Sequence, residues 1–341
     1  MLMTFFQVVT LSLKVVTCLM RPKRSWMEPR CRLPSVLPKV LVDKFKDDFG
    51  PKYQGVESVK VLGMTWLSAE DCFIFQGVSL PSPSEIGCTK RVVLSLTARL
   101  FDPLGLLSPF SIVAKMLFQE VWRLGLDWDE DLPPELKLKF VAWVEGFDVI
   151  KQWKIPRCYS GGLAWKSMTG VELHAFGDAS QTGYGACVYI RIPGPDGSYR
   201  VILVISKAKV APLKPVSLPS LELLYSLLCA RLLVFTRSAL KLSEDTTYRC
   251  YSDSQVALAW IRGNAGRWKT FVANRVGEIQ GLTSPSQWYH CPGPENSADL
   301  VTRGLSAQQL VNSTLWLHGT ILHGCKVRPM RTSLRRNNLW L

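Results

Sequence analysis

The sequence predicts an α/β fold in which helices cover the faces of a mixed sheet, and three observations support this. Three segments rich in β-branched and aromatic residues follow one another at 171–178, 184–192 and 199–210. A long apolar segment with the length and spacing of a helix comes next, at 221–240. Further short strands then alternate with helices. This order is typical of a sheet with helices packed on both faces.

Each element has its own local signal. The turn formers of 194–197 separate the second and third strands, so these two strands are expected to form an antiparallel hairpin. Later in the chain we expect strands at 248–253 and 287–290, helices at 255–261 and 268–282, and a short helix from Asn296. Before the sheet, the sequence predicts strands at 59–66 and 72–75, then helices at 90–100, 111–124 and 134–150.

Four acidic residues stand where these elements begin or end. Asp178 and Asp253 follow predicted strands, whereas Glu222 and Asp299 lie in the first turns of predicted helices, where the helix dipole favours negative charge. Singly, each would be an ordinary turn or helix-start residue. Gathered at one edge of the sheet, they would repel one another unless a cation were bound. Together they predict a site for two Mg²⁺ ions, with Mn²⁺ as an alternative, in which all four are both metal ligands and catalytic residues.

Two polar residues are expected to cap the helices that carry these acids. Ser220 precedes Glu222 by two positions, and Asn296 precedes Asp299 by three. Both residue types are favoured at helix N-caps.

Most of the chain resembles a known family. The motifs that carry the resemblance occur in order, and they are KVLGMTW (60–66), FDPLGLLSPF (101–110), LHAFGDAS (173–180), LPSLELL (218–224), YSDSQVALAWI (251–261), RWKTFVANRVGEI (267–279) and PGPENSADLVTRG (292–304). They resemble the polyprotein of BEL/Pao-type retrotransposons where reverse transcriptase meets ribonuclease H. Any one motif would be weak, but their shared order makes chance agreement improbable.

The resemblance implies a ribonuclease H-like sheet that cuts the RNA strand of RNA/DNA hybrids, preceded by a mostly helical palm-end and thumb-like region of reverse transcriptase. Residues 1–40 are then expected to be a poorly structured or displaced N-terminus, 41–157 the reverse transcriptase region, 165–308 the ribonuclease H-like domain and 309–341 a basic tail. A polymerase needs an aspartate pair on a palm hairpin. Asp47 and Asp48 lack that setting, so no independent polymerase activity is expected.

A basic and aromatic segment is expected to contact the nucleic acid, because basic groups hold phosphates and a ring can pack on sugar. Its residues are Arg262, Arg267, Trp268, Lys269 and Arg275, although Trp268 would serve equally well in the core. The loop 291–295 has no His in the position where cellular ribonucleases H often carry a mobile one. His290, one step earlier, is expected to be a packed or surface residue of the last strand, and turnover is expected to be slow.

Composition agrees with an intracellular nucleic-acid partner, in the cytoplasm or the nucleus. The net charge is +14, which suits a polyanion, and the ten cysteines form no CxxC pair, which favours a reduced chain. The apolar residues 1–20 lack the features of a signal peptide and are too short and interrupted for a membrane span, so no membrane association is expected. The rest of the retroelement polyprotein would be a second partner.

Two other sites were weighed. His318, His323 and Cys325 offer three zinc ligands, but no fourth, and their spacing fits no common zinc site. The family is also catalogued as the Pao retrotransposon peptidase, yet the chain has no Asp-Thr/Ser-Gly motif, so no peptidase activity is expected. One alternative function stays open, a catalytically silent retroelement remnant that binds nucleic acid.

Overall fold

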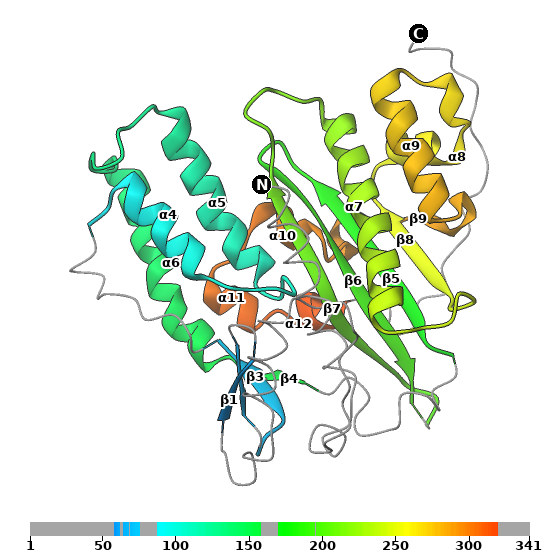
Figure 1. Ribbon diagram of the computed structural model, residues 1–341, viewed down its shortest axis with the longest axis horizontal. Coiled ribbons are helices and arrows are strands. Elements are labelled where there is room, and N and C mark those ends of the chain that lie inside the picture. Colours follow the sequence, from blue (N-terminus) through cyan, green and yellow to red (C-terminus); the bar gives the residue numbers. More distant parts are fainter. Residues whose placement is uncertain are drawn as a thin grey trace, which may run out of the picture.

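The computed structural model describes residues 58–61, 64–67, 69–75, 87–157, 170–194 and 196–319 (Figure 1). A five-stranded sheet lies beside a group of helices, and a small four-stranded sheet lies below that group in the view of Figure 1. The predicted α/β organisation is therefore present. The expectations for residues 1–40, for Asp47 and Asp48, and for His323 and Cys325 fall outside the described residues.

The central sheet has the strand order β7-β6-β5-β8-β9. Its first three strands are antiparallel neighbours, whereas β8 runs parallel to β5, and β9 parallel to β8. All five predicted strands are present, within a few residues of the expected bounds: β5 (Glu172–Ala179), β6 (Gly183–Pro193), β7 (Tyr199–Val210), β8 (Tyr248–Ser252) and β9 (Trp288–His290). The sheet is thus mixed, as the sequence predicted.

Helices cover both faces of this sheet (Figure 1). The long helix α7 (Leu218–Ala239) packs along β5 and β6 on one face, with α8 (Gln255–Arg262) and α9 (Thr270–Leu282) beside it. The short helix α10 (Asp299–Arg303) packs against β5 and β6 from the other face. Within the described residues, α7 alone is long and apolar enough to cross a membrane, but half of its apolar window is buried against the sheet, which accounts for that composition.

The three helices predicted before the sheet are present. They are α4 (Lys90–Arg99), α5 (Ser108–Arg123) and α6 (Pro134–Gln152). Helix α5 begins three residues earlier than expected, because Pro109 occupies its first turn, where a missing N–H costs nothing. These helices do not form a separate body: α5 packs along β7 and α10, and α6 packs against α11 (Ala307–Val311).

The segment 101–110 joins the helices to the sheet through backbone hydrogen bonds. Ser206 N in β7 donates to Leu104 O at 2.8 Å, and Leu305 N donates to Pro109 O at 2.9 Å. The FDPLGLLSPF motif therefore attaches the helices to the sheet.

The small sheet corrects one prediction. Residues 59–66 do not form one strand, because the chain reverses between Val61 and Met64, which pair with each other. The result is two strands, β1 (Ser58–Val61) and β2 (Met64–Leu67), followed by β3 (Cys72–Ile74) and β4 (Ile155–Pro156). Gly63 is the turn former in this segment, and the prediction of one strand did not take it into account.

The fold also extends past residue 308, where the basic tail was expected to begin. Helix α11 spans that boundary, and α12 (Thr314–His318) follows it. The ring of Trp316 is completely buried, and its Nε1 donates to Leu106 O at 2.8 Å. Residues up to 319 are therefore part of the packed structure.

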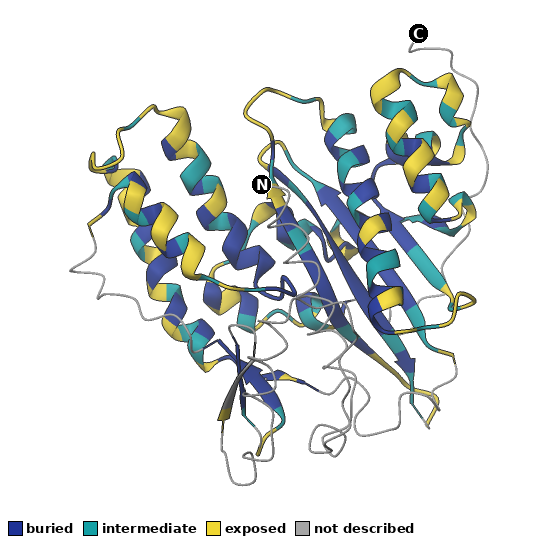
Figure 2. Ribbon diagram, in the orientation of Figure 1, coloured by how far each residue is buried: buried dark blue, intermediate teal, exposed yellow. Residues whose placement is uncertain are grey.

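The buried side chains form one continuous core that runs from the helices into the sheet (Figure 2). The six cysteines of the described residues are buried, and none of them forms a disulfide in that part of the chain. Burial raises the pKa of the Cys229 and Cys250 thiols, so these side chains are inert packing groups.

Candidate active site

Two of the predicted acids lie side by side at one edge of the sheet. In the parallel pair of β5 and β8, Phe176 is opposite Tyr251. Two positions further along each chain, the same register places Asp178 beside Asp253. Because neighbouring strands are about 4.8 Å apart, these two carboxylates occupy adjacent positions at the carboxyl end of the parallel strands.

Two glycines bring helices from both faces close to these acids. A Cβ atom on Gly177 would lie 2.3 Å from the ring of Tyr225 in α7, and one on Gly185 would lie 2.4 Å from Val301 in α10. Gly185 is the cross-strand partner of Asp178. Glycine at both positions therefore lets α7, which carries Glu222, and α10, which begins with Asp299, pack directly on the strand that carries Asp178.

Asp178 is almost completely buried, and its carboxylate accepts a hydrogen bond from the hydroxyl of Thr302 in α10. Burial raises the pKa of Asp178 to about 7, with further contributions from the negative charges of Asp253 and Asp299. The Thr302 hydroxyl opposes the shift but does not cancel it. Burial and the neighbouring acids thus outweigh the favourable contacts of this carboxyl group, and the net shift favours its protonated form.

Glu222 and Asp253 are each held by a hydroxyl group. Ser254 Oγ donates to Glu222 Oε2 at 2.5 Å and also caps α8 by accepting from Ala257 N. Burial and the charge of Asp253 raise the pKa of Glu222. Tyr225 OH, on the buried face of α7, donates to Asp253 Oδ1 at 3.1 Å.

Asp299 lies in the first turn of its helix, as predicted, and its charge reaches Asp178. Its carboxylate is also paired within the helix, where Arg303 Nε donates to Asp299 Oδ1 at 2.7 Å. Asp299 is therefore part of the cluster, but its negative charge is partly neutralised by Arg303.

The two predicted caps are wrong. Helix α7 begins at Leu218 with Pro219 in its first turn, so Ser220 lies inside the helix and hydrogen-bonds with the hydroxyl of Ser217. The N-cap of α10 is Ala298 rather than Asn296. The buried Asn296 amide instead donates to Gly177 O at 2.9 Å and accepts from Ala298 N, which ties the loop to β5.

The four acids form overlapping pairs centred on Asp253. Its charge acts on Asp178 and on Glu222, whereas Asp299 acts on Asp178. As their side chains stand, the described residues contain no group of three or more His, Cys, Asp or Glu that could hold a metal ion. The donor chemistry nevertheless fits Mg²⁺, which prefers carboxylate oxygens and retains several waters. The hydroxyl partners occupy one oxygen each of Asp178 and Glu222, so the second oxygen of each carboxylate could bind a metal.

The predicted nucleic-acid residues lie from the last residue of α8 to the middle of α9. Arg267 and Lys269 are exposed, in the turn between these helices. Arg262 donates to Trp288 O at 2.7 Å, and the guanidinium of Arg275 lies 3.5 Å from the centre of the Phe271 ring. Two of the five residues thus already have contacts within the protein.

Trp268 is half-buried and packs near Trp260, with 6.3 Å between ring centres. It therefore serves the core at least in part. His290 lies in β9 and is partly buried, as expected. His318, the member of the zinc alternative that is described, hydrogen-bonds with Val201 O at 3.1 Å.

Sequence reasoning missed three neutral residues that hold the acids, which are Tyr225, Ser254 and Thr302, and it missed the contact of Asn296 with β5. A signal existed for two of them. Ser254 directly follows Asp253 at the start of a helix, and Thr302 follows Asp299 by one helical turn. Tyr225 and Asn296 act across the fold, so local sequence does not reveal their partners.

Residues 89–254 match the family model of the Pao retrotransposon-like RNaseH-like domain. These residues are therefore similar to the Pao retrotransposon-like RNaseH-like domain. The matched segment includes α4–α6 together with β5–β8, so these helices occur with the sheet in the family, and nothing supports their interpretation as a reverse transcriptase thumb. The sheet is accordingly an RNase H-like mixed sheet with flanking helices.

Among solved structures, one similar chain is the N-terminal RNase H domain of a Mycobacterium tuberculosis protein, determined as a fusion with maltose-binding protein. It shares 16% identity, and the match covers 41% of this chain and 96% of that one with a TM-score of 0.27. The search among curated proteins found no match.

Proposed function

We propose that this domain is a ribonuclease H-type endonuclease that cuts the RNA strand of RNA/DNA hybrids with Mg²⁺, or alternatively Mn²⁺. The observation that carries the proposal is the pair of acids at the ends of two parallel strands, where burial and the charge of Asp253 raise the pKa of both Asp178 and Glu222. A cluster of four acids in which Arg303 pairs with Asp299 alone favours a bound cation.

The residues of the chain have distinct parts in this proposal. Asp178, Glu222, Asp253 and Asp299 would hold the ions, and Tyr225 would keep Asp253 in position through its hydroxyl. When bound, Mg²⁺ would activate a water and stabilise the leaving oxygen. The exposed Arg267 and Lys269 would hold phosphates of the hybrid.

Asp253→Asn tests the metal site. It removes one anionic ligand from the centre of the cluster and leaves the basic surface unchanged, so hybrid cleavage should fall by roughly a thousandfold or more while hybrid affinity stays within about twofold. Cleavage of a labelled hybrid and its binding would be measured with the same purified protein, with and without Mg²⁺. Glu244→Gln, an exposed acid away from the site, is the matched control. Undiminished cleavage by Asp253→Asn would overturn the site assignment.

Lys269→Ala tests the phosphate contact. Loss of one ammonium group should weaken hybrid binding several-fold and reduce its salt dependence by about one counterion, with the cleavage rate at saturation nearly unchanged. Lys137→Ala, on the exposed face of α6 across the molecule in Figure 1, should leave both quantities unchanged. Equal effects of the two variants would show that the α8–α9 surface has no special part in binding.

Nucleic-acid binding without cleavage is the second candidate function. It is favoured by the pairing of Asp299 with Arg303 and by the arrangement of the acids in overlapping pairs. Hybrid binding by wild-type protein that cleaves nothing in Mg²⁺ or Mn²⁺ would select this function. In either case we propose an intracellular site of action, in the cytoplasm or the nucleus, with the remaining polyprotein as a further partner and no membrane partner.

A further inference from the structure

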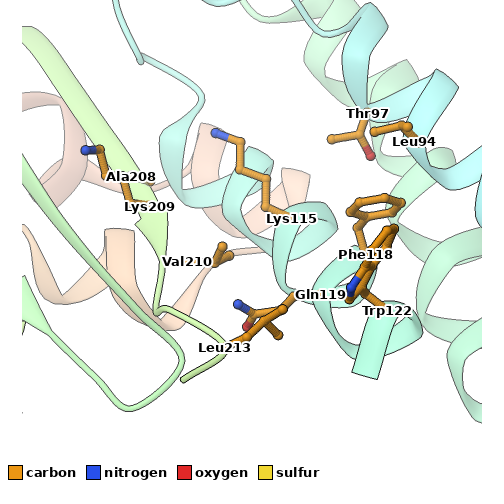
Figure 3. A pocket seen from close by; sticks show the side chains of 10 residues that line it. All are labelled: Leu94, Thr97, Lys115, Phe118, Gln119, Trp122, Ala208, Lys209, Val210 and Leu213. Atoms are coloured by element: carbon orange, nitrogen blue, oxygen red, sulfur yellow. The ribbon is translucent and has the colours of Figure 1, made fainter. Parts of the chain in front are cut away.

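A groove of about 740 Å³ lies between α5 and the end of β7 (Figure 3). Three residues of its α5 wall, Lys115, Phe118 and Trp122, recur at three- and seven-residue spacing, which places them on one face of the helix. Lys209 and Leu213 line the opposite side. The groove therefore combines apolar and aromatic walls with ammonium groups.

The groove opens at the same sheet edge as the acids. Strand β7 ends at Val210, which pairs with Gly183 at the start of β6, directly after the strand that carries Asp178. Ala211 N donates to Thr182 O at 2.9 Å, which fixes this end of the groove next to the turn that follows Asp178. In Figure 1, α5 and the α8–α9 pair lie on opposite sides of α7. The groove is thus separate from the α8–α9 surface.

Lysines gather on the sheet side of the groove. Burial lowers the pKa of Lys207, and the charges of Lys209 and Lys115 lower it further, so the three ammonium groups lie within electrostatic range of one another. Asp102 faces Lys115 and offsets part of this charge. A net positive field remains where β7 meets α5.

Aromatic rings lie at the other end. Trp122 lines the groove, and the ring of Trp128 lies next to it, with 6.2 Å between ring centres. The two side chains are 47% and 42% exposed, unusually large fractions for tryptophan. The buried Lys90 Nζ lies 4.0 Å from the centre of the Trp122 ring and 5.1 Å from that of Trp128, and it donates to Leu126 O. Lys90 thus holds both rings in place from the protein side while their outer surfaces stay accessible.

We propose that this groove binds an unpaired polynucleotide strand that continues from the hybrid at the acid cluster. Phosphates would meet Lys115 and Lys209, and a base would stack on Trp122, with the Trp128 ring next to it. Fixed aromatic surfaces beside a basic track are the usual means of binding single strands without sequence preference. The proposal rests on the proposed function, since the hybrid supplies the strand.

Dimensions and charge both favour this occupant. Lys115 and Trp122 are seven residues apart on α5, about 10 Å along the helix. That distance accommodates about three nucleotides stacked 3.4 Å apart. An apolar peptide would fit the walls but would remove the lysines from water without neutralising them, which is costly.

Binding of two hybrids to the full chain tests the proposal. Both share one duplex, and one also carries a six-nucleotide single-stranded extension. Affinities would be measured without divalent ions, so that cleavage does not enter, and a free single-stranded oligonucleotide would be measured in parallel. Wild-type protein should bind the extended hybrid about tenfold more tightly than the blunt one, because stacking on each ring adds affinity.

The variants separate stacking from charge. Trp122→Ala should abolish the tenfold gain and leave the blunt hybrid unaffected, whereas Trp122→Phe, which keeps a ring, should retain most of it. The double variant Lys115→Gln with Lys209→Gln should lower the slope of log affinity against log salt by about one to two for the extended hybrid. Lys151→Gln, at the opposite end of the helical group, is the control for charge. Circular dichroism would verify that each variant is folded.

The outcomes distinguish this proposal from the proposed function. A gain from the extension that Trp122→Ala removes supports the groove even if the protein never cleaves a hybrid. No gain from the extension, or an equal gain in Trp122→Ala and wild type, overturns it even if cleavage proceeds. Displacement of the free oligonucleotide by an apolar peptide but not by a second oligonucleotide would also overturn it.

Discussion

The two ends of β5 carry carboxylates in opposite electrostatic settings. Glu172 begins the strand and Asp178 lies six residues later, so both belong to one element of one sheet. The surroundings lower the pKa of Glu172 to about 2 and raise that of Asp178 to about 7. The fold therefore neutralises the negative charge at one end of the strand and leaves most of it uncompensated at the other.

At the first end, partners surround the carboxylate of Glu172. His174 Nε2 lies 3.1 Å from Glu172 Oε2, Arg191 Nη1 lies at 2.8 Å, and Arg249 Nη1 at 3.9 Å. The hydrogen bond with His174 is the largest cause of the lowered pKa, and the bond with Arg191 also contributes. This cluster stabilises the fold.

At the other end, the partners of Asp178 are a neutral hydroxyl and two negative groups, Asp253 and Asp299. This arrangement costs stability whenever Asp178 is ionised, a cost typical of sites prepared for a ligand. The difference between the ends therefore separates what holds the sheet together from what the sheet is arranged to bind.

The largest expected effect on stability comes from adding a side chain at Gly177, where α7 approaches the acid end of β5 most closely. Gly177→Ala places a methyl group against the Tyr225 ring, which must then shift, and we expect a loss of about 3 kcal/mol in the free energy of unfolding. Urea unfolding would measure it. The control is Gly277→Ala on α9, where nothing lies within 4 Å, and where alanine should stabilise the helix by about 0.5–1 kcal/mol. Equal stability changes would show that the close approach of α7 is unimportant.

Removing the charge of Glu172, at the start of β5, should lower the stability by a smaller amount. Glu172→Gln removes the charge that His174 and Arg191 stabilise, so the free energy of unfolding at pH 7 should fall by about 1–2 kcal/mol. A lowered pKa means that this contribution is present above about pH 4.5 and disappears as the pH falls towards 2. Unfolding of both proteins from pH 7 down to pH 3 should therefore show converging stabilities. A constant difference would contradict the assigned cause.

The smallest effect is expected at Asp178, where removing the charge should increase the stability instead of lowering it. The raised pKa of Asp178 means that stability is lost as the pH rises from about 3.8 to about 7, since the fold favours the protonated group. Asp178→Asn should thus raise the free energy of unfolding by about 1 kcal/mol at pH 8 in EDTA and change little at pH 4. Mg²⁺ should then stabilise the wild type at pH 8 more than the Asn variant. Destabilisation by Asp178→Asn at pH 8 would show that Thr302 outweighs the uncompensated charge.

Local sequence predicted the sheet well because its strands are bounded by clear turn residues, as at Gly194 and Gly197. It also predicted that Asp178 and Asp253 each follow a strand, whereas the parallel pairing of these two strands came from the structure. Local sequence did not predict the contacts between residues that are far apart in the chain. Asn296 was expected to cap a helix, but its amide is used 119 positions away on Gly177. The packing of α5 on β7 was likewise hidden, because apolar spacing identifies a helix without identifying its neighbour.

The attachment of α5 and segment 101–110 to β7 determines which fragments of the chain would keep the edge of the sheet covered. Strand β7 is the last of its sheet, twelve residues long, and beyond β6 its outer side meets Leu104 and α5. A fragment cut at residue 165 would leave that side without cover, and uncovered strands pair with other chains. Such a fragment is expected to self-associate. A fragment that begins near residue 87 would retain segment 101–110 and α5, which cover β7.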